Sequence, residues 1–354
     1  MIETCFINIT KTTQSRISEL DYDNIEFGKI FADHMFSVEY KDGQWQTPEI
    51  LPYGNLSLSP ATSALHYGQA LFEGMKAYKN AAGEVLMFRP LDNARRLNLS
   101  AERLCMPTLP EDIFMQGLTE LLKLDTDWVP PTKGCALYIR PFMFATDAFI
   151  GVRPSATYKF MIFCCPVGTY YANPLRVKIE TEFARSVEGG AGYAKAAGNY
   201  GAALYPAKLG QEQGYQQLIW TDAKEHKYLE ESGTMNLMFV IDGKLITPAL
   251  STSILAGITR DSVLQLARDW GMTVEERKIS IDEILEAHAN GTLEEAFGCG
   301  TAAVIAPIIT IGYNGKDYEL PAVENRKFSN KVGVELDKIK TGEAPDPHSW
   351  MVKI

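Results

Sequence analysis

Residues 188–203 read EGGAGYAKAAGNYGAA, and this stretch surrounds a single cation, Lys195, with glycines and alanines. A lysine amine becomes a useful nucleophile when it is drawn out of water, because burial lowers its pKa. Small neighbours also let a planar ligand approach the backbone closely. The stretch therefore suggests a lysine that condenses with a carbonyl compound. Considered alone, it is equally consistent with a flexible glycine loop that carries a solvated lysine.

A second stretch, YLEESGTMN at residues 228–236, places two carboxylates, Glu230 and Glu231, before a Ser-Gly-Thr turn. Neighbours in a strand point to opposite faces, so one of the two side chains should face inward. An inward carboxylate can hold a proton on a ligand nitrogen. The alternative is an acidic corner of the surface.

A third stretch, FGCGTAA at residues 297–303, satisfies the GxGxxA pattern of dinucleotide-binding folds. A strand-like run, VIAPIITIG, follows it, whereas the nucleotide fingerprint must open a helix, so that fold is disfavoured. The glycines and Thr301 can instead offer N–H groups and a hydroxyl to a phosphate. Residues 257–260 (GITR) lie at a predicted helix start, where exposed N–H groups also attract an anion.

The composition restricts the partners of this protein. The 354 residues are 46% hydrophobic and carry a formal charge of -10, which favours an ordered globular protein and opposes binding to nucleic acid or an anionic membrane surface. The six cysteines and five histidines show neither a disulfide framework nor metal-ligand spacing. Apolar runs reach about half the roughly 20 residues that cross a bilayer, and the N-terminus lacks a signal pattern, so we expect a cytoplasmic location.

The order of predicted elements indicates an α+β protein. We expect a smaller N-terminal domain at residues 1–165, a linker at 166–176 where proline and glycine cluster, and a larger domain at 177–354 that carries Lys195. The first domain is predicted to contain strands at 31–40, 86–89, 136–142 and 158–164 and helices at 91–104 and 111–125. The second is predicted to contain strands at 177–183, 217–221 and 273–279, a hairpin at 235–248, and helices at 199–213, 259–270 and 281–289. Residues 341–354 are expected to form a surface tail.

Taken together, these stretches resemble the fold-type IV pyridoxal-phosphate enzymes, and among them the branched-chain-amino-acid aminotransferases. The blocks that carry the resemblance are FGKIFADHM (27–35), LHYGQALFEGMKAY (65–78), FRPLDNARRLNLSA (88–101), YIRP (138–141), GGAGYAKAAGNYGAAL (189–204), EESGTMNLMFV (230–240), GITRDS (257–262) and GCGTAA (298–303). The resemblance implies a two-domain α+β fold of the D-amino-acid-aminotransferase type, with pyridoxal 5'-phosphate in the cleft between the domains.

The resemblance also implies roles for cofactor-binding residues. Lys195 would bind the cofactor covalently and shuttle the proton between the substrate Cα and the cofactor C4′. Glu231 would pair with the pyridinium nitrogen, keeping it protonated so that the ring can accept electrons. Arg96, rather than its neighbour Arg95, would bind the phosphate. The remaining predicted contacts are the phenol of Tyr200 to the ring oxygen O3′, and the backbone N–H groups of Ile258 and Thr259 and the hydroxyl of Thr301 to the phosphate.

The substrate site must accept an apolar branched side chain in one half-reaction and a glutamate side chain in the other. The resemblance implies an aromatic enclosure with Arg140 meeting the glutamate carboxylate, and backbone donors from Thr234 and Ala302 for the α-carboxylate. The enclosing residues are Phe27, Phe72, Tyr138 and Tyr170. Tyr67 and Val152 match positions that reach a neighbouring subunit, which implies a homodimer with shared sites. Each of these aromatic residues could instead belong to an ordinary core.

The implied reaction is transfer of the amino group of L-leucine, L-isoleucine or L-valine to 2-oxoglutarate, by ping-pong half-reactions through pyridoxamine phosphate. The sequence does not rank the three amino acids or give the physiological direction. Two same-fold alternatives are a D-amino-acid transaminase and an aminodeoxychorismate lyase, against which the blocks at 27–35 and 138–140 argue. A catalytically idle cofactor-binding module is a third alternative, and the intact set of Lys195, Glu231 and Arg96 argues against it.

Overall fold

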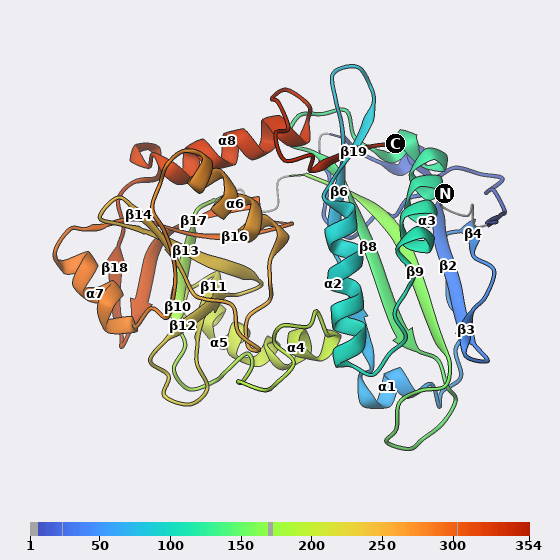
Figure 1. Cartoon of the computed structure of the whole chain (residues 1–354), viewed down its shortest axis with the longest axis horizontal. Coiled ribbons are helices and arrows are strands. Elements are labelled where there is room, and N and C mark those ends of the chain that lie inside the picture. Colours follow the sequence, from blue (N-terminus) through green and yellow to red (C-terminus); the bar gives the residue numbers. More distant parts are fainter. Residues whose placement is uncertain (1–5, 23, 169–172, 303) are drawn as a thin grey trace. The chain divides into compact units, whose positions relative to one another are not determined.

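The computed structural model describes residues 6–22, 24–168, 173–302 and 304–354. It divides into two compact units, each built on its own β-sheet (Figure 1). Unit 1 holds the described part of residues 1–170 together with Ala194–Gly198 and Lys338–Ile354, and unit 2 holds the described part of 171–193 together with 199–337. The segment that carries Lys195 therefore packs with unit 1. The α+β class is confirmed, and the predicted linker at 166–176 stays a proposal.

The sheet of unit 1 has the strand order β1-β4-β2-β9-β8-β6-β7-β19, with β3 paired to β2 and β5 paired to β8. Its longest pairing joins β8 and β9 in antiparallel register, from Ala136 opposite Val167 to Ala145 opposite Tyr158. The elements of this unit are β1 (Asn8–Ile9), β2 (His34–Lys41), β3 (Gln44–Trp45), β4 (Glu49–Pro52), α1 (Ser63–Tyr67), β5 (Ala70–Phe72), β6 (Met75–Lys79), β7 (Val85–Phe88), α2 (Pro90–Arg103), α3 (Glu111–Leu124), β8 (Ala136–Ala145), β9 (Tyr158–Val167) and β19 (Met351–Lys353).

Helices α2 and α3 pack beside this sheet, and both follow from local sequence (Figure 1). Pro90 opens α2, where its missing N–H costs no helical hydrogen bond. Ala94, Leu97 and Ala101, spaced three and four residues apart, form the buried stripe of α2. Leu118 is one of the fully buried residues with which α3 joins the same core. The face of α2 that points inward also carries a predicted site residue, Arg96.

The sheet of unit 2 has the order β12-β11-β10-β17-β16-β13-β14-β15, with β18 paired to β17. Strand β12 also pairs with β13, so six of these strands close into a ring. The elements are β10 (Leu175–Ile179), α5 (Leu204–Glu212), β11 (Gln217–Thr221), β12 (Leu229–Ser232), β13 (Met235–Ile241), β14 (Lys244–Thr247), α6 (Ile258–Asp269), β15 (Val274–Glu276), α7 (Ile281–Ala289), β16 (Leu293–Gly300), β17 (Val304–Tyr313) and β18 (Lys316–Glu319). Helices α4 (Ala197–Ala202) and α8 (Phe328–Lys340) include residues of both units.

Capping and turn residues account for two of the elements predicted in unit 2. Helix α7 occupies the predicted range, and its cap residue Ser280 accepts a hydrogen bond from the N–H of Glu283 at 3.1 Å. The turn between β13 and β14 is made by Asp242 and Gly243, both at positive φ, as a tight hairpin requires. The helix predicted at 199–213 is interrupted and forms α4 and α5 instead.

The expectation of a surface tail at residues 341–354 is wrong. Residues 351–353 form β19, which pairs with β7 at the end of the unit 1 sheet. Trp350 is only 8% exposed and packs edge-on against Phe88, with ring centres 5.6 Å apart. The free energy gained by burying the large Trp350 indole outweighs the tendency of the polar, proline-containing residues before it to stay in solvent.

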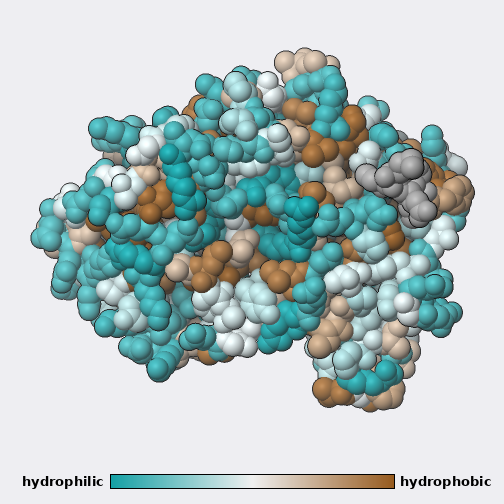
Figure 2. All heavy atoms as spheres, viewed as in Figure 1, coloured by the Kyte–Doolittle hydropathy of each residue, from teal (hydrophilic) through white to brown (hydrophobic). Residues whose placement is uncertain are grey.

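The visible surface is mainly hydrophilic, with separate hydrophobic patches (Figure 2). Within the described part of the chain, no helix combines the length and the apolar character needed to span a membrane.

Candidate active site

Lys195 lies on a short segment whose backbone is fixed on both sides within unit 1. Its N–H donates to Ser100 Oγ on α2 at 2.9 Å, and its carbonyl accepts from the N–H of Phe72 on β5 at 3.1 Å. The next residue, Ala196, forms a bridge with Leu71. The half-buried lysine side chain lies over the ring of Phe72, with Nζ 5.1 Å from the ring centre. The backbone contacts therefore hold the Lys195 amine over the ring of Phe72.

Arg96 lies one helical turn before Ser100, and the Ser100 hydroxyl donates a hydrogen bond to the backbone carbonyl of Arg96 at 2.9 Å. Its Nε and Nη2 each donate to the carboxylate of Glu73 at 2.8 Å, which is a bidentate pair. Arg96 is 8% exposed and Glu73 is fully buried. The neighbouring Arg95, by contrast, pairs at the surface with Glu111. Arg96 and Lys195 are thus tied to the same serine, and the guanidinium has a fixed orientation.

Four predicted substrate residues come together in unit 1. Arg140 Nη2 donates to the hydroxyl of Tyr138 at 3.0 Å, and the guanidinium carbon lies 4.6 Å from the ring centre of Phe72. The ring of Phe27 meets Tyr138 edge-on at 5.1 Å. Arg140 Nε is buried and has no hydrogen-bond partner among the described residues. The aromatic rings can pack against an apolar group, and the guanidinium among them can bind a carboxylate.

Glu231 is the centre of a polar cluster in unit 2. It lies on β12 directly opposite Asn236 on β13, and it is 4% exposed. Asn236 Nδ2 donates to Glu231 Oε1 at 3.2 Å and to the Leu255 carbonyl at 2.8 Å. Arg185 Nη1 lies 2.5 Å from Glu231 Oε2. Arg185 was not predicted, because in the sequence it is a lone arginine in the otherwise uncharged run FARSV before the glycine-rich loop.

The two neighbouring carboxylates differ in burial. Glu231 is buried, whereas Glu230 is half-buried and accepts a hydrogen bond from Ser253 Oγ. Burial raises the pKa of Glu230, with the Ser253 hydrogen bond opposing that effect. On β16, opposite Asn236, burial also raises the pKa of the Cys299 thiol to about 12. The thiol is therefore uncharged at neutral pH and does not repel the Glu231 carboxylate.

Helix α6 begins beside the same cluster. A Cβ on its cap residue, Gly257, would lie 1.9 Å from Asn236 Oδ1, so only glycine lets the helix start this close to the strand. Ile258 and Thr259 occupy the first turn and are 9% and 5% exposed. Because the first N–H groups of a helix lack partners within it, this end favours an anion.

Two further predicted segments lie at one end of the paired strands β13 and β16. Thr234 immediately precedes β13, and Thr301 and Ala302 immediately follow β16. The pairing of Asn236 with Cys299 brings these strand ends side by side. Helix α6 also contacts β16 (Figure 1). Backbone donors and a threonine hydroxyl are therefore concentrated in this part of unit 2.

The other predicted residues are placed differently. Tyr200 lies on α4, five positions after Lys195, and is half-buried. Tyr67 at the end of α1 and Val152 in the loop after β8 are 42% and 90% exposed and lie on the surface of unit 1. Tyr170 lies outside the described residues.

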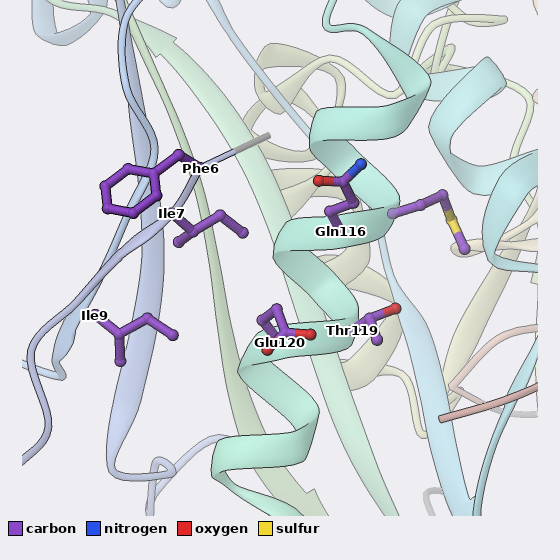
Figure 3. Close-up of a pocket in the computed structure, with 7 residues that line it drawn as sticks. Phe6, Ile7, Ile9, Gln116, Thr119 and Glu120 are labelled. Atoms are coloured by element: carbon purple, nitrogen blue, oxygen red, sulfur yellow. The ribbon is translucent and has the colours of Figure 1, made fainter. Parts of the chain in front are cut away.

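A cavity of about 610 Å³ lies elsewhere in unit 1, between the N-terminal segment and α3 (Figure 3). It is lined by Phe6, Ile7, Ile9, Met115, Gln116, Thr119 and Glu120. These residues include no predicted site residue and no cation, so this cavity is not the candidate active site.

Comparison with known proteins gives a consistent result. Residues 70–311 match the model of the family described as "Amino-transferase class IV". The chain is 46% identical over 339 residues to branched-chain-amino-acid transaminase 1 of Bacillus subtilis, covering 94% of this chain and 95% of that protein. It is 44% identical over 346 residues to branched-chain-amino-acid aminotransferase 2 of the same organism, covering 97% and 95%. The branched-chain aminotransferase of Thermobaculum terrenum, solved in its pyridoxal-phosphate form, superposes with a TM-score of 0.73 at 25% identity, covering 91% and 98%.

Proposed function

The chain belongs to the class IV aminotransferase family, and from this premise we propose which of its residues carry out the reaction. It is a pyridoxal-phosphate-dependent branched-chain-amino-acid transaminase of fold type IV, which transfers the amino group of L-leucine, L-isoleucine or L-valine to 2-oxoglutarate. The observation that carries this conclusion is the near-full-length identity to transaminases of that name.

The described residues fit pyridoxal phosphate in chemistry. The cofactor needs an amine for its aldehyde, cationic and N–H donors for its phosphate, and a carboxylate for its ring nitrogen. Lys195 supplies a half-buried amine and Arg96 a buried guanidinium in unit 1. Glu231 supplies a buried carboxylate in unit 2, close to the start of α6. We propose that these groups bind the cofactor, with Ile258, Thr259 and Thr301 completing the phosphate contacts and Tyr200 donating to the ring oxygen.

The protein groups then have separate tasks. When bound, the cofactor provides an electron sink for the bonds at the substrate Cα. Lys195 Nζ would take the proton from the substrate Cα and deliver it to the cofactor's C4′, acting as the general base and acid. The Glu231 carboxylate holds a proton on the ring nitrogen. Arg96, whose guanidinium is oriented by Glu73, would bind the phosphate end of the cofactor.

Substrate selection is assigned to the aromatic cluster. Phe27, Phe72 and Tyr138 exclude water from an apolar side chain, and Arg140 binds the side-chain carboxylate of glutamate or 2-oxoglutarate. The backbone donors of Thr234 and Ala302 bind the α-carboxylate. Tyr170 is assigned to the same enclosure, although it lies outside the described residues.

We also propose that the chain forms a homodimer in which Tyr67 and Val152 reach the neighbouring active site. Leu65, Ile150 and Val152 are 66%, 69% and 90% exposed, and a bridge between Thr62 and Ala148 ties α1 to the loop that carries the latter two. Exposed apolar side chains concentrated in this way favour a protein interface. Light scattering should show a dimer for the wild type and a shift toward monomer for Val152→Asp, and a wild type that is monomeric would refute the proposal.

The proposed cytoplasmic location is testable by cell fractionation.

Borohydride reduction of the holoenzyme, followed by peptide mapping, tests the central assignment. We expect the reduced cofactor on Lys195, and no such label in Lys195→Arg. A label on another lysine would refute the assignment.

Steady-state assays with L-leucine, D-alanine and aminodeoxychorismate separate the three same-fold activities, and a preference for D-alanine would reject the branched-chain activity. Adding L-isoleucine should convert the cofactor absorbance to that of its amino form, whereas an idle binding module would leave the spectrum unchanged.

A further inference from the structure

We propose that Arg185 is a positioning residue whose positive charge keeps the proton shared by Glu231 and the cofactor on the cofactor's ring nitrogen. This inference rests on the proposed function, because it needs pyridoxal phosphate to bind at Glu231. It extends that function by naming a residue that controls how well the ring withdraws electrons.

The Glu231 carboxylate is contacted at both oxygens, by an ion pair at one and a hydrogen bond at the other. Arg185 Nη1 lies 2.5 Å from Oε2, and Asn236 donates to Oε1 at 3.2 Å. Arg185 is itself fixed, because the same Nη1 donates to the Ser253 carbonyl at 3.0 Å. The side chains of Arg185 and Glu231 are only 8% and 5% exposed. The carboxylate therefore cannot rotate freely, and solvent screens this ion pair weakly.

The position of the shared proton follows from the proton affinities of its two possible holders. Burial alone favours the neutral form of a carboxylic acid, so a buried glutamate would compete with the ring nitrogen for the proton. A guanidinium in direct contact opposes that tendency, because it stabilises the carboxylate anion. Its effect falls with distance, so it acts most on the oxygens that it touches and less on a group that the carboxylate binds. The arginine therefore shifts the proton toward nitrogen.

The other charged and titratable groups near the carboxylate do not take over this task. The Cys299 thiol is buried and stays protonated at neutral pH. Glu230 accepts from Ser253 Oγ and would, if charged, add to the negative potential. Arg260 on α6 is paired with Glu276 at 2.9 Å and with the Pro248 carbonyl at 3.0 Å. Arg185, by contrast, contacts the Glu231 carboxylate directly.

The test uses the holoenzyme with pyridoxal phosphate labelled with ¹⁵N at the ring nitrogen. Arg185→Met removes the charge, Arg185→Gln removes the charge but keeps amide donors, and Arg185→Lys keeps the charge. Arg268→Met is the matched control, since Arg268 forms a 2.6 Å ion pair with Glu276 on the exposed side of unit 2. The ¹⁵N chemical shift should report a protonated nitrogen in the wild type, the control and Arg185→Lys. In Arg185→Met and Arg185→Gln, the ratio of protonated to neutral nitrogen should fall about 10- to 1000-fold, the range expected for loss of an adjacent opposite charge.

A ratio of protonated to neutral nitrogen equal to that of the wild type in either uncharged variant, with the cofactor fully bound, would overturn the proposal. If neither uncharged variant folds, Arg185→Lys decides the question: a protonated nitrogen supports the proposal, and a neutral one overturns it. A wild type that retains no pyridoxal phosphate, or that leaves L-leucine unchanged, would instead refute the proposed function before any variant is compared.

Discussion

Gly74→Ala should weaken the reaction with glutamate more than the reaction with leucine. A Cβ at this position would lie 2.2 Å from the Tyr138 hydroxyl and 3.0 Å from the carbon that bears it. Tyr138 is only 6% exposed, so its ring has little room in which to move away. The hydroxyl is the group that accepts a hydrogen bond from Arg140 Nη2. The added methyl group therefore acts on the residue assigned to the glutamate side chain.

The size of the effect follows from the distances. The hydroxyl must withdraw from 2.2 Å to the 3.4 Å at which ordinary van der Waals contact begins, a movement of about 1.2 Å. Such a movement breaks a hydrogen bond of 3.0 Å unless Arg140 follows it. A hydrogen bond to a charged group contributes about 1.5–3 kcal/mol, which corresponds to roughly 10- to 100-fold in the second-order rate constant for L-glutamate. The reaction with L-leucine needs no such cation and should change less.

Single-turnover measurements with the two amino donors, followed by the absorbance of the bound cofactor, give both rate constants on one preparation. The double variant Gly74→Ala, Tyr138→Phe removes the clashing hydroxyl, so it should recover stability without recovering the reaction with glutamate. Gly333→Ala on α8 is the control, because a Cβ there meets Ile305 only at 3.7 Å. Equal losses with both donors would refute the reasoning, since a disturbance transmitted to the cofactor would affect them alike.

Three other perturbations have defined outcomes. Arg96→Gln leaves the buried Glu73 carboxylate without its guanidinium and should lower the free energy of unfolding of the apoprotein in urea by about 3–5 kcal/mol. Arg95→Gln at the surface should lower it by less than about 1 kcal/mol. Similar losses for the two variants would contradict the buried ion pair. At pH 8 a disulfide reagent should modify exposed Cys105 and spare Cys299, whose pKa is raised to about 12. Because the unfolded chain ionises this thiol near its ordinary pKa of 9.0, stability should fall as the pH rises above that value, and a pH-independent contribution would argue against burial. Deleting residues 350–354 removes β19 and a buried indole and should destabilise unit 1 by about 3–5 kcal/mol, measurable by thermal unfolding.

Elements with strong local signals were predictable from the sequence. Helix α7 has a capping serine and an apolar period within its own nine residues, and its predicted range is confirmed. The β13-β14 turn is equally local, since Asp242 and Gly243 alone provide the positive φ angles. The buried position of Glu231 also agrees with the expectation that one of the two neighbouring carboxylates faces inward.

Features that depend on distant partners were not predictable in the same way. The strand at 351–353 forms only because β7 offers an unpaired edge and Phe88 a surface for Trp350. Arg185 is notable only because it forms an ion pair with Glu231, which lies far from it in the sequence and meets it only in the folded chain. The position of Arg140 between Tyr138 and Phe72 likewise combines two strands, β8 and β5. Periodicity along one segment contains no information about such pairings.

The discontinuity of unit 1 has a consequence for biosynthesis. When a ribosome makes this chain, β7 emerges long before β19, and α2 emerges long before the segment with Lys195 that hydrogen-bonds to it. Unit 2 occupies a nearly continuous stretch between these late pieces, so the nascent chain can close the second sheet before the first one is complete. The sheet of unit 2 can then form before that of unit 1, and the edge of β7 stays unpaired until residues 351–353 have been synthesised.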